Sequence, residues 1–513
     1  MNKNKFYVTT PLYYVNSKPH LGTLYSTLLA DVAARWNKFL GKKVFFLTGT
    51  DEHGQKIAEK AKQEGLAPKE FVDSMIPKFK ETWKLYEIEY DKFIRTTDKE
   101  HEDAVVKWIN KLEGNGDIYK SSYTGWYCVP CETFVSLEDD AEIVCPTCRR
   151  ELKKISEENY FFRLSAYEDR LLKFYEENPN FVIPKGRLNE VISFVKSGLK
   201  DLSISRKGLK WGITYPGDDD HSIYVWADAL NNYISAIGYG SDDVKKQEEF
   251  KFLWPADLQI MAKDILRFHA VYWPAFLMAA NIPLPLRVYG HGWILSGDEK
   301  MSKSKGNILD PLEIIKTYGL DPLRYYLIKE VSFGNDGNIS KEKLENCINS
   351  DLANNFGNLC QRVTAFAQKN CSAKVPKIIK FNKEDLEMLN KFTNNLENIR
   401  NEIDKQNVNF YIDFIVNALF EANKYFNDQE PWKKKEDLDR LNTIVYTSLE
   451  MIRKISFMLY PIIPQTINKV LKIFNLDSNA ISLESIASHD KLRSGEPINK
   501  IDILFKKIEK NND

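Results

Sequence analysis

The sequence predicts an α/β domain built on a parallel sheet, interrupted by an insertion with paired cysteines and followed by an all-α helix bundle. Three observations lead to this fold class. A strand, a helix and a second strand follow one another within the first 50 residues. Four of the 7 cysteines fall between residues 128 and 148, among short strands and turns. Beyond about residue 340, apolar residues recur at helical spacing and Gly and Pro are scarce.

The first strand, helix and strand form a βαβ unit. Residues 6–10 have the apolar character of a buried strand, apolar residues recur at helical spacing from Leu21 to Trp36, and Gly41 ends that helix. Residues 44–48 form the second strand. A βαβ unit predicts a Rossmann-like parallel sheet, in which ligands bind at the carboxyl ends of the strands.

The clustered cysteines are Cys128, Cys131, Cys145 and Cys148, which form two CxxC pairs with 13 residues between them. Each pair presents two thiolates from one tight turn. Four thiolates suit tetrahedral zinc and leave no open coordination position. The spacing therefore predicts a zinc knuckle within the insertion, with one structural zinc ion per chain.

Element signals divide the chain into five ranges. The α/β character stops before the cysteine pairs and returns after them. Asp310-Pro311 marks a helix start, Gly319 its end, and Asp321-Pro322 the next start. The predicted ranges are 1–113 and 224–296 for the two halves of the α/β domain, 114–223 for the insertion, 297–340 for a lysine-rich loop and the segment after it, and 341–513 for the helix bundle.

Composition limits the class of protein. The 72 Lys and Arg balance the 72 Asp and Glu, so any contact with a polyanion comes from local basic patches. No run of about 18 uncharged apolar residues occurs, and the first residues lack the pattern of a secretion signal. The cysteine clustering favours metal binding over a disulfide framework. We expect a cytoplasmic protein that does not enter a membrane.

Two motifs suit phosphate groups. Pro19-His20-Leu21-Gly22 places an imidazole at a helix N-terminus, where free backbone N–H groups favour an anion. Residues 300–307 read KMSKSKGN and gather ammonium and hydroxyl groups in one loop. Taken singly, the histidine suits a structural turn and the loop a solvated lysine-rich segment. Their order on a parallel α/β scaffold, roughly 280 residues apart, favours a two-part ATP site.

The two motifs resemble the HIGH and KMSKS signatures of class I aminoacyl-tRNA synthetases. The second is present letter for letter, whereas Thr23 stands where the second histidine of HIGH usually lies. Residues 13–16 (YYVN), 49–54 (GTDEHG) and 224–230 (YVWADAL) are similar to the methionine enzymes of that class. This resemblance covers nearly the whole chain. It implies a catalytic α/β domain and an anticodon-binding helix bundle.

The resemblance implies an enzyme that activates L-methionine with ATP and transfers it to the 3′-terminal adenosine of tRNA(Met). Catalysis then consists of positioning and charge stabilisation, because the reaction needs no side-chain nucleophile. The implied catalytic residues are His20, Lys300 and Lys303. The implied ATP-binding residues are His20, Gly22, Thr23, Lys263, Asp264, Lys300, Met301, Ser302, Lys303 and Ser304.

The implied methionine site combines one carboxylate with apolar and aromatic side chains. Asp51 pairs with the substrate ammonium, while rings and aliphatic carbons suit the thioether. Without the resemblance, Asp51 suits a helix N-cap and the aromatic residues suit core packing. The implied set is Pro11, Leu12, Tyr14, Asp51, Trp226, Ala229, Tyr233, Ile265 and His269.

The helical range contains residues that resemble an anticodon-reading set. Asn358 and Arg362 are four residues apart and therefore share one helix face, and Trp432 follows much later. Amide and guanidinium groups bind the edges of unstacked bases, and indole rings stack on them. A surface Asn/Arg pair also occurs without any function.

The resemblance further implies Mg²⁺ with ATP, tRNA(Met) as partner and, because no further domain follows the bundle, a monomer.

Two alternatives stay open. A synthetase for leucine, isoleucine, valine or cysteine shares the two signatures, but the insertion is small for an editing domain and the cysteine pairs all lie within it. A noncatalytic RNA-binding protein on a synthetase scaffold also fits, although both phosphate motifs are intact.

Overall fold

The computed structural model describes residues 4–128, 133–135, 143–146, 149–296, 299–300, 311–489 and 491–509. The chain forms two compact units, and helix α1 (Leu21–Phe39) contributes residues to both. Unit 1 contains residues 1–30 and 44–291, and unit 2 contains residues 31–43 and 292–513. No helix within the described ranges has the length and apolar character needed to cross a bilayer.

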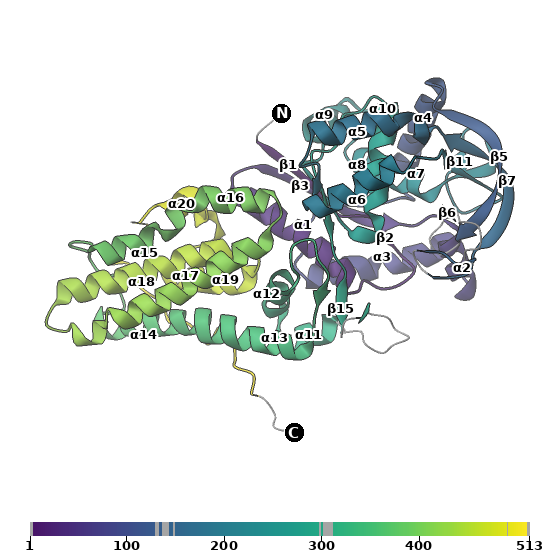
Figure 1. The fold of residues 1–513 in the computed structure, drawn as a ribbon. Coiled ribbons are helices and arrows are strands. Elements are labelled where there is room, and N and C mark those ends of the chain that lie inside the picture. Colours follow the sequence, from purple (N-terminus) through teal and green to yellow (C-terminus); the bar gives the residue numbers. More distant parts are fainter. Residues whose placement is uncertain are drawn as a thin grey trace. The chain divides into compact units, whose positions relative to one another are not determined.

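A seven-stranded sheet forms the centre of unit 1 (Figure 1). Its strands lie in the order β2-β3-β1-β13-β14-β8, and β4 pairs with β3. The defined registers in this sheet are parallel, which confirms the predicted parallel α/β fold. The strands are β1 (Lys5–Thr9), β2 (Tyr13–Tyr14), β3 (Lys43–Asp51), β4 (Lys92–Arg95), β8 (Val182–Ile183), β13 (Leu258–Ala262) and β14 (Val288–His291).

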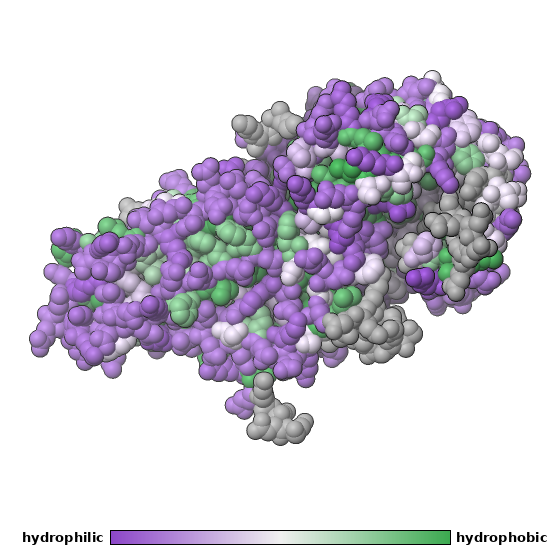
Figure 2. Space-filling view, viewed as in Figure 1, coloured by the Kyte–Doolittle hydropathy of each residue, from purple (hydrophilic) through white to green (hydrophobic). Residues whose placement is uncertain are grey.

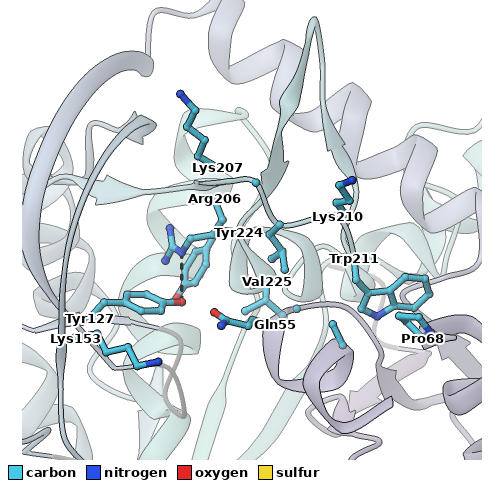
Figure 3. Close-up of a pocket in the computed structure, with 14 residues that line it drawn as sticks. Gln55, Pro68, Tyr127, Lys153, Arg206, Lys207, Lys210, Trp211, Tyr224 and Val225 are labelled. Carbon is cyan, nitrogen blue, oxygen red and sulfur yellow. Dashed lines mark hydrogen bonds between the residues drawn. The ribbon is translucent and has the colours of Figure 1, made fainter. Parts of the chain in front are cut away.

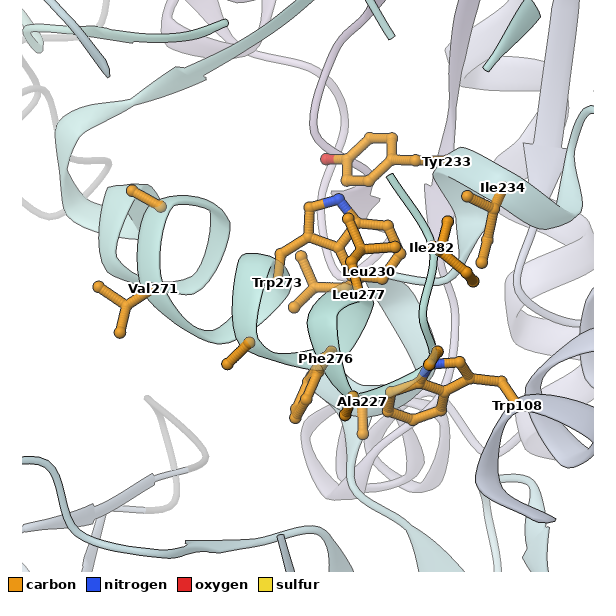
Figure 4. Close-up of a cluster of buried hydrophobic side chains, with 14 of the residues drawn as sticks. Trp108, Ala227, Leu230, Tyr233, Ile234, Val271, Trp273, Phe276, Leu277 and Ile282 are labelled. Atoms are coloured by element: carbon orange, nitrogen blue, oxygen red, sulfur yellow. The ribbon is translucent and has the colours of Figure 1, made fainter. Parts of the chain in front are cut away.

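Both faces of the central strands are covered. Every residue of β1 and of β14 is buried, although successive side chains point to opposite faces. Trp108 of α4 (Lys99–Gly114) meets Phe276 of α10 (Trp273–Ala279) edge to face, with ring centroids 5.0 Å apart (Figure 4). One core thus joins helices that are far apart in the sequence.

Antiparallel strands stand between β4 and β13 in the chain. The pair β5 (Ile118–Cys128) and β7 (Lys153–Phe162) is flanked by β6 and β9, and β10, β12 and β11 form a second sheet. Strand β8 also comes from the range 114–223, yet it pairs with β14 in the parallel sheet. The finer boundaries stay predictions. The further strands are β6 (Thr133–Val135), β9 (Leu202–Ser203), β10 (Ser205–Lys207), β11 (Thr214–Tyr215) and β12 (Asp218–Ile223).

The other α-helices of unit 1 lie between and after these strands in the chain. They are α2 (Gln55–Gln63), α3 (Pro68–Leu85), α5 (Glu168–Glu177), α6 (Lys185–Lys196), α7 (Val225–Ala229), α8 (Asn232–Ser235) and α9 (Val244–Leu253).

Unit 2 is mainly helical, which confirms the predicted bundle. Helix α18 (Leu438–Leu459) is buried on all sides from Thr443 onward, as expected for a helix at the centre of a bundle. Arg324 binds Asp31 at 2.6 Å in the same unit. Helix α11 begins at Pro311, as predicted, and Gly319 after it has a φ of 90°; Asp310 lies outside the described residues.

The remaining elements of unit 2 follow the chain order. Its strands are β15 (Ile294–Ser296), β16 (Glu299–Lys300) and β17 (Gly337–Asn338). Its other α-helices are α11 (Pro311–Tyr318), α12 (Leu320–Glu330), α13 (Lys341–Cys347), α14 (Asn358–Asn370), α15 (Lys383–Thr393), α16 (Leu396–Asp404), α17 (Val408–Asp428), α19 (Pro464–Leu471) and α20 (Leu483–Ala487).

Candidate active site and anticodon-reading site

The carboxyl ends of three adjacent strands gather predicted substrate residues in unit 1. Strand β1 lies between β3 and β13. Pro11 and Leu12 follow β1, Asp51 ends β3, and Lys263 and Asp264 follow β13. Open parallel sheets bind their ligands at this edge. The strand order therefore brings segments from three parts of the sequence to one location.

A pocket of about 420 Å³ opens at this edge. Its lining joins three predicted methionine residues to two predicted ATP residues, namely Tyr14, Trp226 and Ile265 with Lys263 and Asp264. The ammonium of Lys56 lies 4.9 Å from the centre of the Tyr14 ring. The other predicted methionine residues do not line this pocket. These are Pro11, Leu12, Asp51, Ala229, Tyr233 and His269.

Stacked rings form one wall of the pocket. Trp226 on α7 stacks on Phe268, with ring centroids 3.8 Å apart and planes 6° from parallel. Phe268 begins a π-helical turn (Phe268–Tyr272), a feature frequent at functional sites. The sequence patterns did not point to Phe268, although its place beside the predicted residue His269 was an available signal.

Tyr233 and His269 are buried close to this wall. The ring centroids of Trp226 and His269 are 6.1 Å apart. Nε2 of His269 lies 2.7 Å from the Tyr233 hydroxyl, and Nδ1 lies 3.0 Å from the carbonyl oxygen of Ile265. A carbonyl only accepts, so Nδ1 carries the hydrogen and Nε2 accepts from Tyr233. Burial lowers the pKa of His269 to about 4, so the ring is neutral at neutral pH.

His20 caps the helix that it precedes. Its Nδ1 accepts hydrogen bonds from the backbone N–H groups of Gly22 at 3.1 Å and Thr23 at 3.4 Å. A Cβ at residue 22 would lie 3.1 Å from the imidazole, so glycine makes room for the ring. Two of the N–H groups expected to be free for an anion, those of Gly22 and Thr23, are therefore bound by His20 itself, and the role of this helix start in ATP binding stays a prediction. Thr23 is buried.

A buried network supports the end of β3, next to Asp51. Asp228 holds His53 Nδ1 through Oδ2 and His101 Nε2 through Oδ1, both at 2.7 Å. Burial opposes the charged form of His53, but the Asp228 carboxylate, together with the smaller effects of Glu102 and Glu52, outweighs burial and raises the pKa of His53. Burial likewise acts to raise the pKa of Asp228, and the two imidazoles lower it. The network joins the segment just after β3 to α4 and α7.

Glu52 anchors the same strand end. Arg95 binds both carboxylate oxygens of Glu52, with both distances 2.8 Å. The indole of Trp211 donates to the Glu52 carbonyl oxygen at 2.6 Å. Such two-point contacts fix orientation as well as position. The backbone that carries Asp51 is therefore held from several sides.

The predicted KMSKS loop falls largely outside the described residues. Lys300 ends β16, and its backbone pairs with Leu295. Met301, Ser302, Lys303 and Ser304 lie outside the described residues. Their predicted roles stay predictions.

Two of the four predicted zinc ligands are described. Cys128 and Cys145 are buried in one small cluster with Leu152. Hydrogen bonds of 2.8 Å from Arg149 N to the Cys145 carbonyl and from Cys145 N to the Arg150 carbonyl close the turn after Cys145. Cys131 and Cys148 lie outside the described residues. The chemistry and placement of the two described thiols fit the predicted ligand set.

In unit 2, two of the three predicted anticodon residues belong to one group. Arg362 donates to the Asn427 side-chain oxygen at 2.6 Å, and its guanidinium lies 5.7 Å from the centre of the Phe426 ring. Trp432 meets Phe426 edge to face at 6.1 Å. Asn358 begins α14, one helical turn before Arg362. The sequence patterns did not point to Phe426 and Asn427, which stand shortly before Trp432 in the chain.

Comparison with known proteins finds matching protein families for both units. The family described as tRNA synthetases class I (M) matches residues 6–155 and 151–364. The anticodon binding domain of methionyl tRNA ligase matches residues 375–513. The methionine–tRNA ligase of Thermotoga maritima is 45% identical over 98% of this chain and 80% of its own length. That of Brucella suis is 45% identical over 92% of each chain.

Solved structures match this chain over nearly its whole length. Mycobacterium tuberculosis methionyl-tRNA synthetase in complex with methionyl-adenylate matches with a TM-score of 0.93 at 39% identity, over 98% of this chain and 99% of that one. Its apo form matches with a TM-score of 0.86 at 36% identity, over 99% of each. A class I tRNA synthetase is the kind of protein that the parallel sheet and these matches define. The match of residues 375–513 to the anticodon binding domain of methionyl tRNA ligase narrows this class to one family. The chain belongs to the methionine–tRNA ligase family.

Proposed function

We propose that this chain activates L-methionine with ATP, giving methionyl-adenylate and pyrophosphate, and then transfers methionine to the 3′-terminal adenosine of tRNA(Met). The observation that carries the proposal is the pocket in unit 1. There an aromatic wall suited to a thioether adjoins Lys263 and Asp264, which suit a nucleotide. Membership of the family supports the same reaction.

On the methionine side, Asp51 pairs with the substrate ammonium. It is buried at the end of β3, opposite Tyr14 in the register with β2. Trp226 and Tyr233 offer ring surface to the thioether, and neutral His269 adds no charge that would favour a polar side chain. The remaining residues of this set are Pro11, Leu12, Ala229 and Ile265.

On the ATP side, His20 supplies a hydrogen-bond donor. Because its Nδ1 accepts from the backbone, Nε2 of the neutral ring carries the hydrogen and donates it to a phosphate oxygen. Lys263 faces the phosphates, and Asp264 accepts from the ribose. Lys300 and Lys303 approach the leaving pyrophosphate. The remaining residues of this set are Gly22, Thr23, Met301, Ser302 and Ser304.

The reaction needs no side-chain nucleophile. The methionine carboxylate attacks the α-phosphorus, the bond to the bridging oxygen breaks, and pyrophosphate leaves with the electron pair. The terminal adenosine hydroxyl then attacks the activated carbonyl, and AMP leaves. The side chains hold the reactants in line and stabilise charge. Mg²⁺ bound to ATP supplies further charge neutralisation.

The other predicted groups have supporting roles. Asn358, Arg362 and Trp432 read the anticodon. Cys128, Cys131, Cys145 and Cys148 would hold a zinc ion, which when bound would supply a structural link and no reactive position. The monomeric state and the cytoplasmic location expected from the sequence stay predictions.

The test is amino-acid-dependent ATP–pyrophosphate exchange by the purified chain, without tRNA, across all twenty amino acids. Exchange with methionine alone is expected. Exchange with a different amino acid would keep the class and remove the pocket assignment, and no exchange at all would favour the noncatalytic RNA-binding alternative.

Two variants test the methionine side and the ATP side separately in this assay, and each serves as the control for the other. Asp51→Asn removes the partner of the ammonium, so kcat/KM for methionine should fall about 30-fold or more while the KM for ATP holds. Asp264→Asn should raise the KM for ATP and spare that for methionine. A reversed or equal pattern would overturn the assignment of the two residues.

A further inference from the structure

The two sides of the methionine site come from parts of the sequence that are far apart. Asp51 ends β3, whereas Trp226 lies on α7. A hydrogen bond joins these two parts: Nδ1 of His53 donates to the Asp228 carboxylate at 2.7 Å, across 175 positions of the chain. His53 is the second residue after Asp51, and Asp228 is the second residue after Trp226. The bond therefore fixes the carboxylate side of the site relative to its aromatic side.

This bond lies away from the polar surface. Figure 2 shows many hydrophilic residues on the surface of unit 1, whereas His53 and Asp228 are both buried. Taking two charged groups out of water costs free energy that their mutual attraction only roughly offsets, and apolar side chains of similar size would stabilise the fold about as well. Stability alone therefore does not explain a carboxylate and an imidazole at this point, whereas a requirement for one fixed geometry does.

The segment that carries His53 depends on side-chain contacts because it is neither helix nor strand. Residues 52–54 connect β3 to α2, and Gly54 has a φ of 104°, which other residues rarely adopt. Trp211 meets the His53 ring edge to face, with ring centroids 5.4 Å apart. Trp211, Gly54 and the α7 residue Val225 line one pocket of about 730 Å³ (Figure 3). Trp211 and α7 thus hold the segment through His53.

The other end of the bond is fixed by packed helices. Asp228 accepts a second hydrogen bond from Nε2 of His101 on α4, also at 2.7 Å. The opposite ring nitrogen of His101 lies 2.8 Å from the Ser235 hydroxyl on α8. Three helices therefore set the orientation of the Asp228 carboxylate, and the irregular segment after β3 takes its position from that carboxylate.

We propose that Asp228, acting through His53, is a positioning residue for methionine, because it holds the Asp51 carboxylate where the substrate ammonium lies. This inference rests on the proposed function, in which Asp51 pairs with that ammonium. Asp228 and His53 do not contact the substrate themselves. A displacement of about 1 Å at a binding group can lower a rate about 100-fold, so loss of the bond should lower methionine use at least about tenfold.

Two substitutions of His53 separate the hydrogen bond from the volume of the ring. The amide N–H of His53→Asn stands near the position of Nδ1 and keeps the bond to Asp228. His53→Gln is closer to histidine in volume, but its amide stands near the position of Nε2. In pyrophosphate exchange, kcat/KM for methionine should fall about tenfold or more in His53→Gln and stay within about threefold of the parent in His53→Asn. The KM for ATP should stay within about twofold in both. The opposite order, or equal losses, would overturn the proposal.

The matched control is His221→Gln. His221 is a second buried histidine of unit 1 beside a carboxylate, with Nδ1 3.0 Å from Asp218. This variant should keep methionine-dependent exchange within about twofold of the parent. A loss as large as that in His53→Gln would show that any broken histidine–carboxylate pair has this effect, and the positioning role would be refuted.

A double variant tests whether His53 acts through Asp51. Once Asp51→Asn has removed the carboxylate, His53 has nothing left to position, so adding His53→Gln should lower kcat/KM for methionine by less than about twofold. Losses that multiply would contradict the proposal. Asp228→Glu keeps the charge but moves the carboxylate by one methylene group, and it takes the place of His53→Gln if that variant does not fold.

Two inhibitors of exchange give an independent readout. Methioninol keeps the ammonium of methionine, whereas the 2-hydroxy analogue carries a hydroxyl in its place. In His53→Gln the inhibition constant of methioninol should rise about tenfold and that of the hydroxy analogue should stay within about twofold. An equal rise for both would show a distorted thioether pocket and would sink the proposal. Absence of exchange in the parent enzyme would instead overturn the proposed function.

Discussion

The Tyr233 hydroxyl donates a 2.7 Å hydrogen bond to Nε2 of His269, and this contact fixes a buried imidazole in one neutral tautomer. The opposite ring nitrogen donates to the carbonyl of Ile265, a residue of the activation pocket. The buried Tyr233 hydroxyl and the carbonyl of half-buried Ile265 thereby orient the ring beside Trp226. A fixed neutral ring gives the thioether site a defined shape without a charge.

Tyr233→Phe should therefore weaken methionine use. The change keeps the ring but leaves the buried Nε2 without its donor, so kcat/KM for methionine in pyrophosphate exchange should fall about tenfold. The KM for ATP should stay within about twofold. Tyr239→Phe is the control, because the Tyr239 hydroxyl has no hydrogen bond to a residue in the described ranges. Equal effects of the two variants, or an equal change in both KM values, would contradict the role given to this contact.

The neutral state of His269 predicts a pH dependence of stability. Burial lowers its pKa to about 4 in the folded chain from 6.5. Between these values the unfolded chain binds a proton that the folded chain does not, so stability falls as pH falls from 6.5 towards 4. At pH 5 this loss is about 2 kcal/mol.

His269→Gln should remove that part of the pH dependence. Urea unfolding of the parent and the variant at pH 7 and pH 5 measures it, with the transition that the substitution shifts taken for unit 1. The difference between the two pH values should be about 2 kcal/mol smaller in the variant. An unchanged difference would show that the ring is already protonated in the folded chain at pH 5.

Asp228 should be far more important to stability than a surface carboxylate. Asp228→Asn leaves two buried histidines without their charged partner, so unfolding should become easier by about 3–5 kcal/mol. Asp242→Asn breaks an ion pair in which Asp242 is 97% exposed, and should cost under about 1 kcal/mol. Chemical denaturation of both variants checks this, and similar losses would contradict it.

Asp228→Asn should also change how the stability of the chain depends on pH. The pKa of His53 is raised in the folded chain, so the stabilisation by its ion pair is complete below the unfolded pKa and is lost as pH rises through the folded one. This dependence should vanish in Asp228→Asn. A histidine whose NMR titration shifts to lower pH in the variant would identify the group.

Much of the fold follows from local patterns in the sequence. The strand–helix–strand start is a periodic signal, and a parallel sheet then places Asp51 at a carboxyl edge together with Lys263. The helical range is predicted for the same reason, because its apolar spacing is regular over long stretches. Signals of this kind lie within one element and need no tertiary contact.

Other features depend on contacts between distant residues, and no local pattern carries them. The bond between His53 and Asp228 joins residues 175 positions apart, so only the packing of α7 against the end of β3 reveals it. Similarly, Arg362 and Asn427 are 65 positions apart and meet between two helices. The cap that His20 makes depends on a rotamer of the ring, which the tetrapeptide does not specify.

Arg362 gives a prediction for the second unit. Its contacts with Asn427 and Phe426 hold a planar donor beside aromatic rings, so Arg362→Gln should lower kcat/KM for tRNA in the charging reaction about 10- to 100-fold. Methionine-dependent pyrophosphate exchange should not change. Arg400→Gln, an exposed arginine on α16, is the control and should leave both activities near the parent values. A loss of exchange in Arg362→Gln would point to unfolding instead.

The cysteines divide into two groups that metal analysis can separate. Burial raises the pKa of Cys371 to about 11 and that of Cys347 to about 12, so these thiols stay protonated at neutral pH and are poor metal ligands. The paired cysteines should instead hold one zinc ion per purified chain. The double change Cys128→Ser, Cys131→Ser should remove that zinc and lower the midpoint of thermal unfolding, because a closed four-thiolate site contributes directly to folding. Cys371→Ser should keep the full zinc content by atomic emission, and equal zinc in the two variants would place the metal elsewhere.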